Sequence, residues 1–356
     1  MINSRLQALR EQLTKKNLQA ILVTKKQDIF YLSSFSGDDT FLFITLHDAY
    51  LTTDFRYVEQ AEREAPLYQL IRKENNLWDK LNDIIQKQKI SRIGVQECDI
   101  SFDDYKKYTS NLTNVTLLSA DNILQLLRIK KTSQELDNIR VAVEIADNAF
   151  SHILNYIKVG MTEKEISLEL EYFMRKHKAS GVSFETIVAS GVRSSMPHGV
   201  ASDKIISYGD TITLDYGAIY NNYCSDMTRT IFIGDPNEEI LKIYDIVKLA
   251  QTEAIKKAQP GTNICDIDKT ARDVISNYGY GNYFGHALGH GVGLDVHELP
   301  SVSTKSTEVL EAGMVITIEP GIYLPNVGGV RIEDMLAITP HSNVILPTSS
   351  KDIIIL

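Results

Sequence analysis

The sequence contains few cysteines and no long apolar run, and these two absences exclude several classes of protein. Its three cysteines, Cys98, Cys224 and Cys265, are far apart and form no Cys-x-x-Cys motif, so neither a disulfide framework nor a thiolate zinc site is expected. No apolar segment approaches the roughly 20 residues of a membrane span. The N-terminus also lacks the apolar core of a secretory signal, so we expect a cytoplasmic protein.

An excess of basic charge is absent as well. The 37 lysines and arginines are outnumbered by 46 aspartates and glutamates, which gives a formal net charge of −9 at pH 7. This balance argues against nucleic acid or an acidic membrane as the main partner. The hydrophobic content of 43% is ordinary for a globular protein, and 356 residues suffice for two domains with complete cores.

The order of the predicted elements divides the chain into two domains. In residues 1–125, helical segments alternate with apolar strand segments such as 41–46, which predicts an α/β domain with a mixed sheet. Thr132 and Glu135 then form a capping-box pattern at the start of a long helix. In residues 126–356, two helices followed by strands and a carboxylate-bearing hairpin occur twice. This repetition predicts an α+β domain with a pseudo-twofold axis and an antiparallel sheet backed by helices.

Two aspartates on a predicted hairpin pose an electrostatic problem. Residues 211–232 alternate with period two on either side of a turn near Tyr220 and Asn221, which is typical of a β-hairpin. A tip between these two residues would place Asp215 directly opposite Asp226, with Cβ atoms roughly 5 Å apart on one face. Like charges in that position destabilise a sheet, so either a cation lies between them or one aspartate holds a proton.

A second predicted hairpin, residues 315–335, repeats this arrangement. Glu319 and Glu333 are symmetric about Asn326 in a glycine-rich turn, so they should face each other. Surface carboxylates on a solvated strand face would explain one such pair. Two pairs on mostly apolar strands favour a site instead, because unpaired buried carboxylates cost too much free energy.

The glycine-rich segment 285–298 adds three imidazoles, His286, His290 and His297, at spacings of four and seven residues. Its glycines allow the backbone to approach a bound group closely. A lone histidine here would more often be structural, but three in the domain of the paired carboxylates predict a site. His198, in a loop, is a weaker fourth candidate. The remaining histidines have no motif context and are expected at the surface or in the core: His47, His152, His177 and His341.

Four carboxylates and one imidazole form an oxygen-rich ligand set for two divalent metal ions. Oxygen ligands favour Mn²⁺, with Co²⁺ or Zn²⁺ as alternatives, over metals that prefer thiolates. The four positive charges would offset the four negative charges of the carboxylates. Two ions roughly 3.5–4 Å apart would activate water and polarise a carbonyl, so metal-assisted hydrolysis is the predicted reaction class.

The motifs around these residues resemble those of the proline-specific pita-bread metallopeptidases, the family of Xaa-Pro dipeptidase (prolidase) and aminopeptidase P. The resemblance covers nearly the whole chain, since residues 53–61 are similar to the N-terminal domain of that family. It implies a creatinase/prolidase-like domain over residues 1–125 and a catalytic pita-bread domain over 126–356. The segments that carry it are Leu214-Asp-Tyr-Gly, Ser225-Asp-Met-Thr-Arg-Thr, Gly289-His-Gly-Val-Gly-Leu, His297-Glu, Ile318-Glu-Pro-Gly-Ile-Tyr and Val330-Arg-Ile-Glu-Asp.

The resemblance also implies the metal ligands and their roles. Asp215 would bind one ion, His290 and Glu319 would bind the other, and Asp226 and Glu333 would bridge both. Glu319 would additionally take a proton from the attacking water and pass it to the leaving nitrogen.

Four further residues receive implied roles beside the ligands. His198 and His297 would bind the substrate and polarise it around the scissile bond, and His286 would help to line the pocket for proline. Arg331 would hold a metal-ligand carboxylate in place by charge-assisted hydrogen bonds.

The implied activity is hydrolysis of the Xaa-Pro bond in dipeptides or short peptides. The compact two-domain length favours an Xaa-Pro dipeptidase, and aminopeptidase P is the alternative. The segment after His297 and Glu298 contains no cation for the free carboxylate of a dipeptide, which weakens the dipeptidase interpretation. The N-terminal domain argues against methionine aminopeptidase, and the five retained ligands argue against creatinase. The same ligands argue against a non-catalytic pita-bread binding protein.

A homodimer is also implied by the resemblance. The N-terminal domain of the family commonly closes the site of the partner subunit. By this analogy, the loop of residues 33–39 would contact substrate across the dimer.

Overall fold

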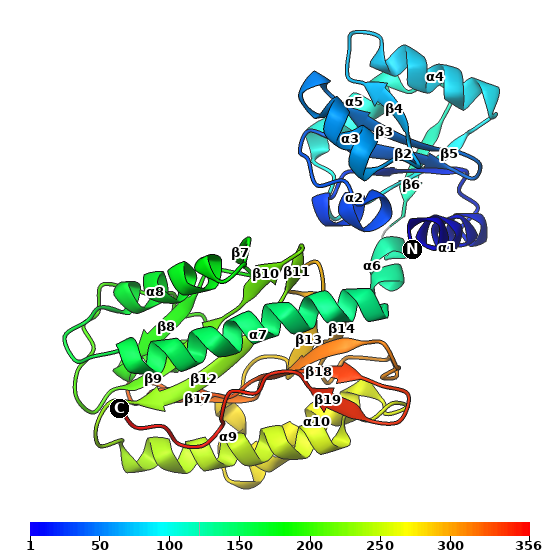
Figure 1. Cartoon of the computed structure of the whole chain (residues 1–356). Coiled ribbons are helices and arrows are strands. Elements are labelled where there is room, and N and C mark those ends of the chain that lie inside the picture. Colours follow the sequence, from blue (N-terminus) through cyan, green and yellow to red (C-terminus); the bar gives the residue numbers. More distant parts are fainter. Residues whose placement is uncertain (121) are drawn as a thin grey trace. The chain divides into compact units, whose positions relative to one another are not determined.

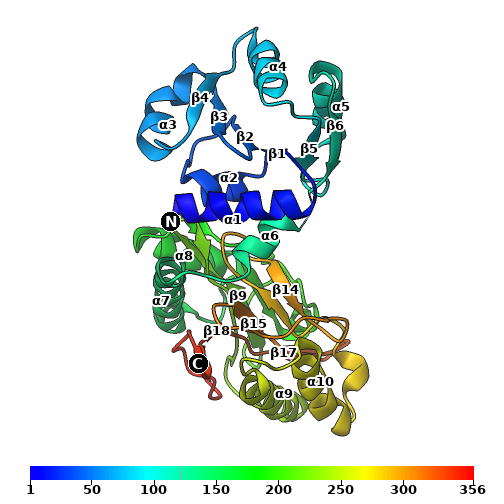
Figure 2. The ribbon, with the colours of Figure 1, turned by 90° about the vertical axis from the view of Figure 1, so that its right-hand side faces the viewer.

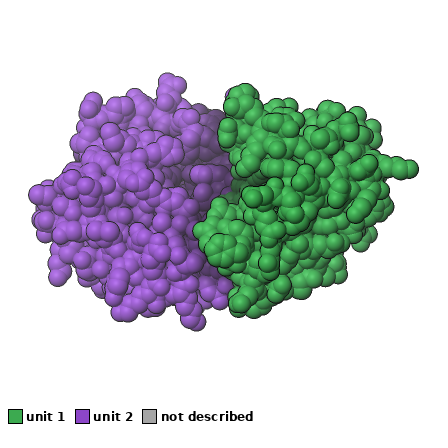
Figure 3. Space-filling model, turned by 90° about the horizontal axis from the view of Figure 1, so that it is seen from above, with its two compact units in different colours: residues 1–128 green, residues 129–356 purple. Residues whose placement is uncertain are grey.

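The computed structural model describes residues 1–120 and 122–356, which form two compact units, Met1–Arg128 and Ile129–Leu356 (Figures 1 and 3). The boundary that we predicted after residue 125 falls inside helix α6 (Ile123–Arg128). Among the described residues, no helix has the length and apolar character needed to cross a membrane.

The first unit contains a six-stranded mixed sheet, as its alternation of helices and strands predicts. Its strands are β1 (Ala20–Val23), β2 (Phe41–Thr45), β3 (Ala49–Thr53), β4 (Gln69–Arg72), β5 (Arg92–Val95) and β6 (Thr116–Ser119). The strand order is β4-β3-β2-β1-β5-β6, with β1 antiparallel to β2 and parallel to β5. Besides α6, the helices are α1 (Ile2–Lys15), α2 (Lys26–Ser33), η1 (Phe55–Tyr57), α3 (Val58–Glu64), α4 (Leu77–Lys87) and α5 (Phe102–Asn111).

The second unit contains two helix pairs, and its strands pair antiparallel. The helices are α7 (Ser133–Tyr156), α8 (Glu163–Lys176), η2 (Gly191–Ser195), α9 (Glu238–Lys257), α10 (Ile264–Asn277) and η3 (Gly281–Tyr283). The strands of the first half are β7 (Gly181–Val182), β8 (Ile187–Ser190), β9 (Thr211–Tyr216), β10 (Ala218–Tyr220), β11 (Tyr223–Cys224) and β12 (Met227–Phe232). Those of the second half are β13 (Gly289–Gly291), β14 (Glu298–Val302), β15 (Val315–Ile318), β16 (Gly321–Leu324), β17 (Gly328–Arg331), β18 (Asp334–Ile338) and β19 (Asn343–Ile345).

The capping box that we predicted at the start of the long helix α7 is confirmed. The side-chain oxygen of Thr132 accepts a hydrogen bond from the backbone N–H of Glu135 at 3.3 Å. In return, the Glu135 carboxylate accepts one from the backbone N–H of Thr132 at 2.9 Å. Two N–H groups that lack a partner within the helix are thereby satisfied.

Each helix pair packs against the strands of its own half (Figures 1 and 2). The first core joins α7 and α8 to β8, β9 and β12 and includes Ile153 and Leu214. The second joins α9 and α10 to β15 and β18 and includes Val247 and Ile316. The second unit therefore has the predicted repetition of a helix pair, strands and a hairpin.

The register that we predicted for the first hairpin is wrong by two residues. Asp215 on β9 lies opposite Thr228 on β12, not opposite Asp226. The tip lies between Asn221 and Asn222, whose φ angles of 47° and 68° fit a two-residue type I′ turn. A shift of two residues does not change the face of a strand. The two carboxylates therefore lie diagonally on the same face instead of directly opposite each other.

The register that we predicted for the second hairpin is confirmed. Ile318 pairs with Asp334, and Gly321 pairs with Arg331, so the residues between them on each side are also opposite each other. Asn326 lies in the turn with a φ angle of 63°. Glu319 and Glu333 consequently face each other where β15 ends and β18 begins.

Candidate functional site

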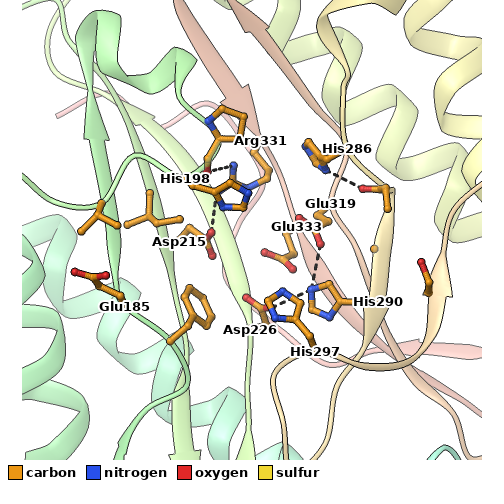
Figure 4. A pocket seen from close by; sticks show the side chains of 17 residues that line it. Glu185, His198, Asp215, Asp226, His286, His290, His297, Glu319, Arg331 and Glu333 are labelled. Atoms are coloured by element: carbon orange, nitrogen blue, oxygen red, sulfur yellow. Dashed lines mark hydrogen bonds and ion pairs between the residues drawn. The ribbon is translucent and has the colours of Figure 1, made fainter. Parts of the chain in front are cut away.

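One pocket of about 500 Å³ in the second unit brings together all of the predicted site residues (Figure 4). Among the described residues that line this pocket, there is none of the four histidines that have no motif context in the sequence. The predicted site residues that do line it are Asp215, Asp226, His290, Glu319, Glu333, His198, His286, His297 and Arg331.

The five candidate metal ligands come from different strands that converge on the pocket. Asp215 lies near the end of β9, and Asp226 directly precedes β12. Glu319 lies between β15 and β16, and Glu333 lies between β17 and β18. His290 is the central residue of β13, directly before a β-bulge. In a regular ladder these side chains would stay spread along one face of the sheet. The breaks in the strands and the β-bulge turn the side chains toward a common point.

The distances between these side chains fit a metal centre. Nε2 of His290 lies 3.3 Å from Oε1 of Glu319 and 3.6 Å from Oδ2 of Asp226. Asp226, His290 and Glu333 each offer one ligand atom, and these three atoms lie within 4.8 Å of one another. Oδ1 of Asp215 and Oε1 of Glu333 are buried without a hydrogen-bond partner. Buried oxygens without partners cost free energy, and divalent ions would satisfy them.

The carboxylates of the cluster have perturbed pKa values. Burial raises the pKa of Asp226 well above its ordinary value, and the nearby charges of Glu333 and Asp215 raise it further. Burial, with the charges of Glu319 and Asp215, also raises the pKa of Glu333. The raised pKa values of Asp226 and Glu333 favour their protonated forms when no cation compensates their charges, which is one of the two answers to the electrostatic problem.

Glu319 differs from the other carboxylates of the cluster. Burial alone would raise its pKa, but the hydrogen bond and charge of His290, together with the charges of His286 and Arg331, lower it below its ordinary value. A lowered pKa keeps the Glu319 carboxylate ionised at neutral pH, unlike the carboxylates of Asp226 and Glu333, whose pKa values are raised.

Arg331 is the buried cation of the site. Its Nη2 donates to Oδ2 of Asp215 at 2.6 Å, and its Nε donates to the hydroxyl of Thr228 at 3.1 Å. Its Nη1 donates to the Tyr323 hydroxyl at 2.9 Å and to the carbonyl oxygen of Pro197 at 3.0 Å. The guanidinium thus orients one candidate ligand and ties it to the loop that carries a candidate histidine.

Two residues of this network, Thr228 and Tyr323, were not predicted from the sequence as site residues. The hydroxyl of Thr228 donates to Oε2 of Glu333 at 2.7 Å, and the hydroxyl of Tyr323 lies 2.9 Å from Nε2 of His286. Thr228 follows Asp226 by two residues on the same strand face, and this spacing was a usable signal. Tyr323 ends a segment that carried the family resemblance, but its hydroxyl contacts come from distant parts of the chain.

The two remaining histidines, His198 and His297, line the same pocket beside the carboxylates (Figure 4). The ring of His297 is 4.3 Å from that of His290, measured between centroids. Burial and the neighbouring His290 lower the pKa of His297, which favours a neutral imidazole at neutral pH. His198 directly follows Pro197, whose carbonyl oxygen accepts from Arg331. A neutral imidazole can donate a hydrogen bond to a substrate carbonyl without adding charge.

A clamp on helix α10 fixes the segment that carries His286. Nε and Nη2 of Arg272 donate to the two oxygens of Asp268 at 2.9 Å each. The same guanidinium donates to the carbonyl oxygens of Phe284 and His286, both at 2.9 Å. Oδ1 of Asp268, which is fully buried, also accepts from the backbone N–H of Leu288 at 3.1 Å. The side chains of Arg272 and Asp268 together hold three backbone positions of the segment before β13.

Comparison with known families gives matches to both units of the chain. Residues 137–340 match the family described as Metallopeptidase family M24. Residues 5–130 match the Creatinase/Prolidase N-terminal domain.

Several relatives are similar over nearly the full length. An uncharacterized peptidase of Bacillus subtilis is 40% identical over 352 residues, which cover 99% of this chain and 100% of the relative. An Xaa-Pro dipeptidase of Pyrococcus horikoshii is 38% identical over 361 residues, with 99% of both chains covered.

Two solved structures are similar to the whole chain. That of an Xaa-Pro dipeptidase from Bacillus anthracis has a TM-score of 0.97 at 39% identity and covers 100% of both chains. That of an X-Pro aminopeptidase from Thermotoga maritima has a TM-score of 0.89 at 38% identity and covers 96% of this chain and 98% of the other.

Proposed function

Because the chain belongs to metallopeptidase family M24 and carries a creatinase/prolidase N-terminal domain, we propose that it is an Xaa-Pro dipeptidase of the pita-bread fold. The observation that supports this most directly is the pocket itself, where four carboxylates and His290 converge around buried oxygens without partners. Full-length similarity to Xaa-Pro dipeptidases of Pyrococcus horikoshii and Bacillus anthracis supports the substrate class.

Membership of the family implies divalent metal ions, and we propose two of them per chain. The residues that would hold them are Asp215, Asp226, His290, Glu319 and Glu333. Their mostly oxygen donors favour Mn²⁺, with Co²⁺ and Zn²⁺ as alternatives. When bound, the ions lower the pKa of the attacking water and polarise the scissile carbonyl.

The side chains of the pocket would carry out the proton transfers and hold the substrate. Glu319, ionised through its contact with His290, would accept a proton as water attacks the carbonyl carbon. It would return that proton to the prolyl nitrogen as the C–N bond breaks, which releases Xaa and proline. The scissile nitrogen is that of proline and carries no hydrogen in the peptide, so general peptidases that need an N–H there fail on this bond. His198 and His297 would donate hydrogen bonds to the peptide around the scissile bond.

Aminopeptidase P activity is the alternative, since the similar Thermotoga maritima structure is that of an X-Pro aminopeptidase. The assay that separates the two compares Xaa-Pro with Xaa-Pro-Yaa peptides on the purified chain loaded with Mn²⁺. A dipeptidase should cleave the dipeptide and leave the tripeptide nearly intact. Cleavage of the tripeptide alone would establish the alternative, and no turnover of either by metal-loaded protein would favour a binding protein.

Substitution of Arg272 should weaken substrate binding more than it slows chemistry. Arg272→Met releases the segment that presents His286, which we assign to the proline pocket. We expect KM for Xaa-Pro to rise about fivefold, equivalent to about 1 kcal/mol, with kcat changed less. Steady-state kinetics measure both constants.

Arg175→Met is a matched control for this experiment. Arg175 makes the same kind of contacts, to Glu171 four residues earlier and to the carbonyl oxygen of Ser180, both at 2.9 Å. It lies on α8 and does not line the pocket. The control should leave KM unchanged. If Arg272→Met lowers the melting temperature but leaves KM at the control value, the clamp has only a structural role.

The homodimer and the cytoplasmic location expected from the sequence stay predictions. Size-exclusion chromatography with light scattering measures the first directly, and a monomeric mass for the active protein would contradict it.

A further inference from the structure

One wall of the pocket is apolar and ends in a single carboxylate. Phe184, Ile187 and Val200 form the apolar part, and Glu185 lines the pocket beside them. Glu185 is exposed, whereas Asp215, Asp226 and Glu333 are buried. In Figure 4 it lies on the side of the cluster that faces away from His286 and His290.

The strand register places this wall next to Asp215. Ile187 lies opposite Asp215 on β9 and forms a bridge with Val200, so these three side chains share one face. Glu185 precedes Ile187 by two residues and lies just outside β8. It nevertheless lines the same pocket as Asp215.

The charge of Glu185 is not compensated by the protein. In the part of the chain that the structure describes, no hydrogen bond or ion pair is made by its carboxylate. The buried cation of the pocket, Arg331, is engaged by Asp215 and other partners. An apolar surface that leads to a free carboxylate matches a side chain with an aliphatic stem and a cationic head.

We propose that this wall is the subsite for the side chain before proline, and that Glu185 selects lysine or arginine there. The inference rests on the proposed function, because it takes an Xaa-Pro peptide as the ligand. With proline on the side of His286, the preceding residue extends past Asp215 toward Ile187 and Glu185. Lysine and arginine side chains reach about 6–7 Å from the backbone, so an aliphatic stem on the apolar residues of this wall would leave the cationic head beyond them.

The test compares Arg-Pro with norleucine-Pro, which has an aliphatic side chain without the charge. Wild-type, Mn²⁺-loaded enzyme should give a higher kcat/KM for Arg-Pro than for norleucine-Pro. Glu185→Gln should reduce this ratio about fivefold, as expected for one partly solvated ion pair, and change norleucine-Pro less than about twofold. Calorimetric binding of both dipeptides to the metal-free chain should show the same loss of preference without turnover.

Glu253→Gln serves as the matched control, since Glu253 lies on α9, pairs with Lys256 and does not line the pocket. It should leave the ratio unchanged. An equal loss for both dipeptides in Glu185→Gln would mean that Glu185 binds the substrate α-ammonium and would overturn the proposal. An unchanged ratio, with both dipeptides cleaved, would overturn the subsite but leave the proposed function intact. If the wild type cleaves no Xaa-Pro dipeptide, the proposed function fails and the subsite fails with it.

Discussion

Replacing Asp226 with asparagine should abolish peptidase activity and at the same time stabilise the metal-free protein. An amide cannot supply two anionic oxygens to the metal centre, so we expect kcat/KM to fall about a thousandfold, equivalent to about 4 kcal/mol. In the metal-free protein Asp226 is buried beside Glu333 and Asp215, and its ionisation is unfavourable. Removing that charge should raise the free energy of unfolding by about 1–2 kcal/mol near pH 8.

This gain in stability should depend on pH in one direction. Burial and the neighbouring carboxylates raise the pKa of Asp226, so the folded protein binds its proton more tightly than the unfolded chain does. The resulting stabilisation of the wild type is fully present below the unfolded pKa, near 4, and is lost as pH rises through the raised folded value. Urea unfolding of metal-free wild type and Asp226→Asn should therefore differ more at about pH 8 than at about pH 5.

Asp147→Asn is the control for this experiment, because Asp147 is also a buried aspartate of the second unit. Its oxygens accept hydrogen bonds from the backbone and side chains of Thr348 and Ser349. Loss of these charge-assisted bonds should destabilise the protein by about 1–3 kcal/mol. If Asp226→Asn destabilises the metal-free protein in the same way at pH 8, the ionised Asp226 is not unfavourable in the folded protein.

Replacing Arg331 with methionine should have the opposite effect on stability. The guanidinium is nearly buried, with a side-chain exposure of 4%, and it pairs with Asp215. Without it Asp215 is left as an unpaired buried charge, which should cost about 3–5 kcal/mol in the free energy of unfolding of the metal-free protein. Activity should fall about 10- to 100-fold even with saturating metal, because a candidate ligand loses its orienting partner.

A double-mutant cycle separates this pairing from a general packing defect. In an Asp215→Asn background, the loss in free energy of unfolding caused by Arg331→Met should be about 2 kcal/mol smaller than in the wild type, because no carboxylate is left unpaired. Arg331→Lys keeps the charge but not the forked geometry, so it should restore part of the stability and little of the activity. If the cost of Arg331→Met is the same in both backgrounds, Arg331 does not act through Asp215.

The two hairpins illustrate what could be predicted from the sequence and what could not. The register about Asn326 followed from the symmetry of the apolar pattern on both sides of one glycine-rich turn. The first hairpin has the same kind of pattern, but alternation with period two is unchanged by a shift of two residues. Only the turn geometry decides between such registers, and the Asn221-Asn222 type I′ turn displaced the tip by one residue.

The ligand types were predictable, whereas the groups that hold them were not. Carboxylates and imidazoles within glycine-framed or alternating segments are visible as local patterns. The contacts of Thr228 with Glu333 and of Tyr323 with His286 join residues 105 and 37 positions apart in the chain. Arg272 reaches its carbonyl partners from a helix whose local sequence shows no sign of the site. Such contacts depend on tertiary packing, which periodicity does not describe.

We propose that the converging carboxylates and His290 hold two divalent ions in one pocket. Anomalous X-ray diffraction from crystals of the Mn²⁺-loaded protein, recorded at the manganese absorption edge, tests this most directly. We predict two peaks per chain, both within bonding distance of Asp226 and Glu333, with Asp215 beside one ion and His290 and Glu319 beside the other. A single peak, or peaks away from these side chains in protein that cleaves Xaa-Pro, would contradict a two-ion centre at these residues.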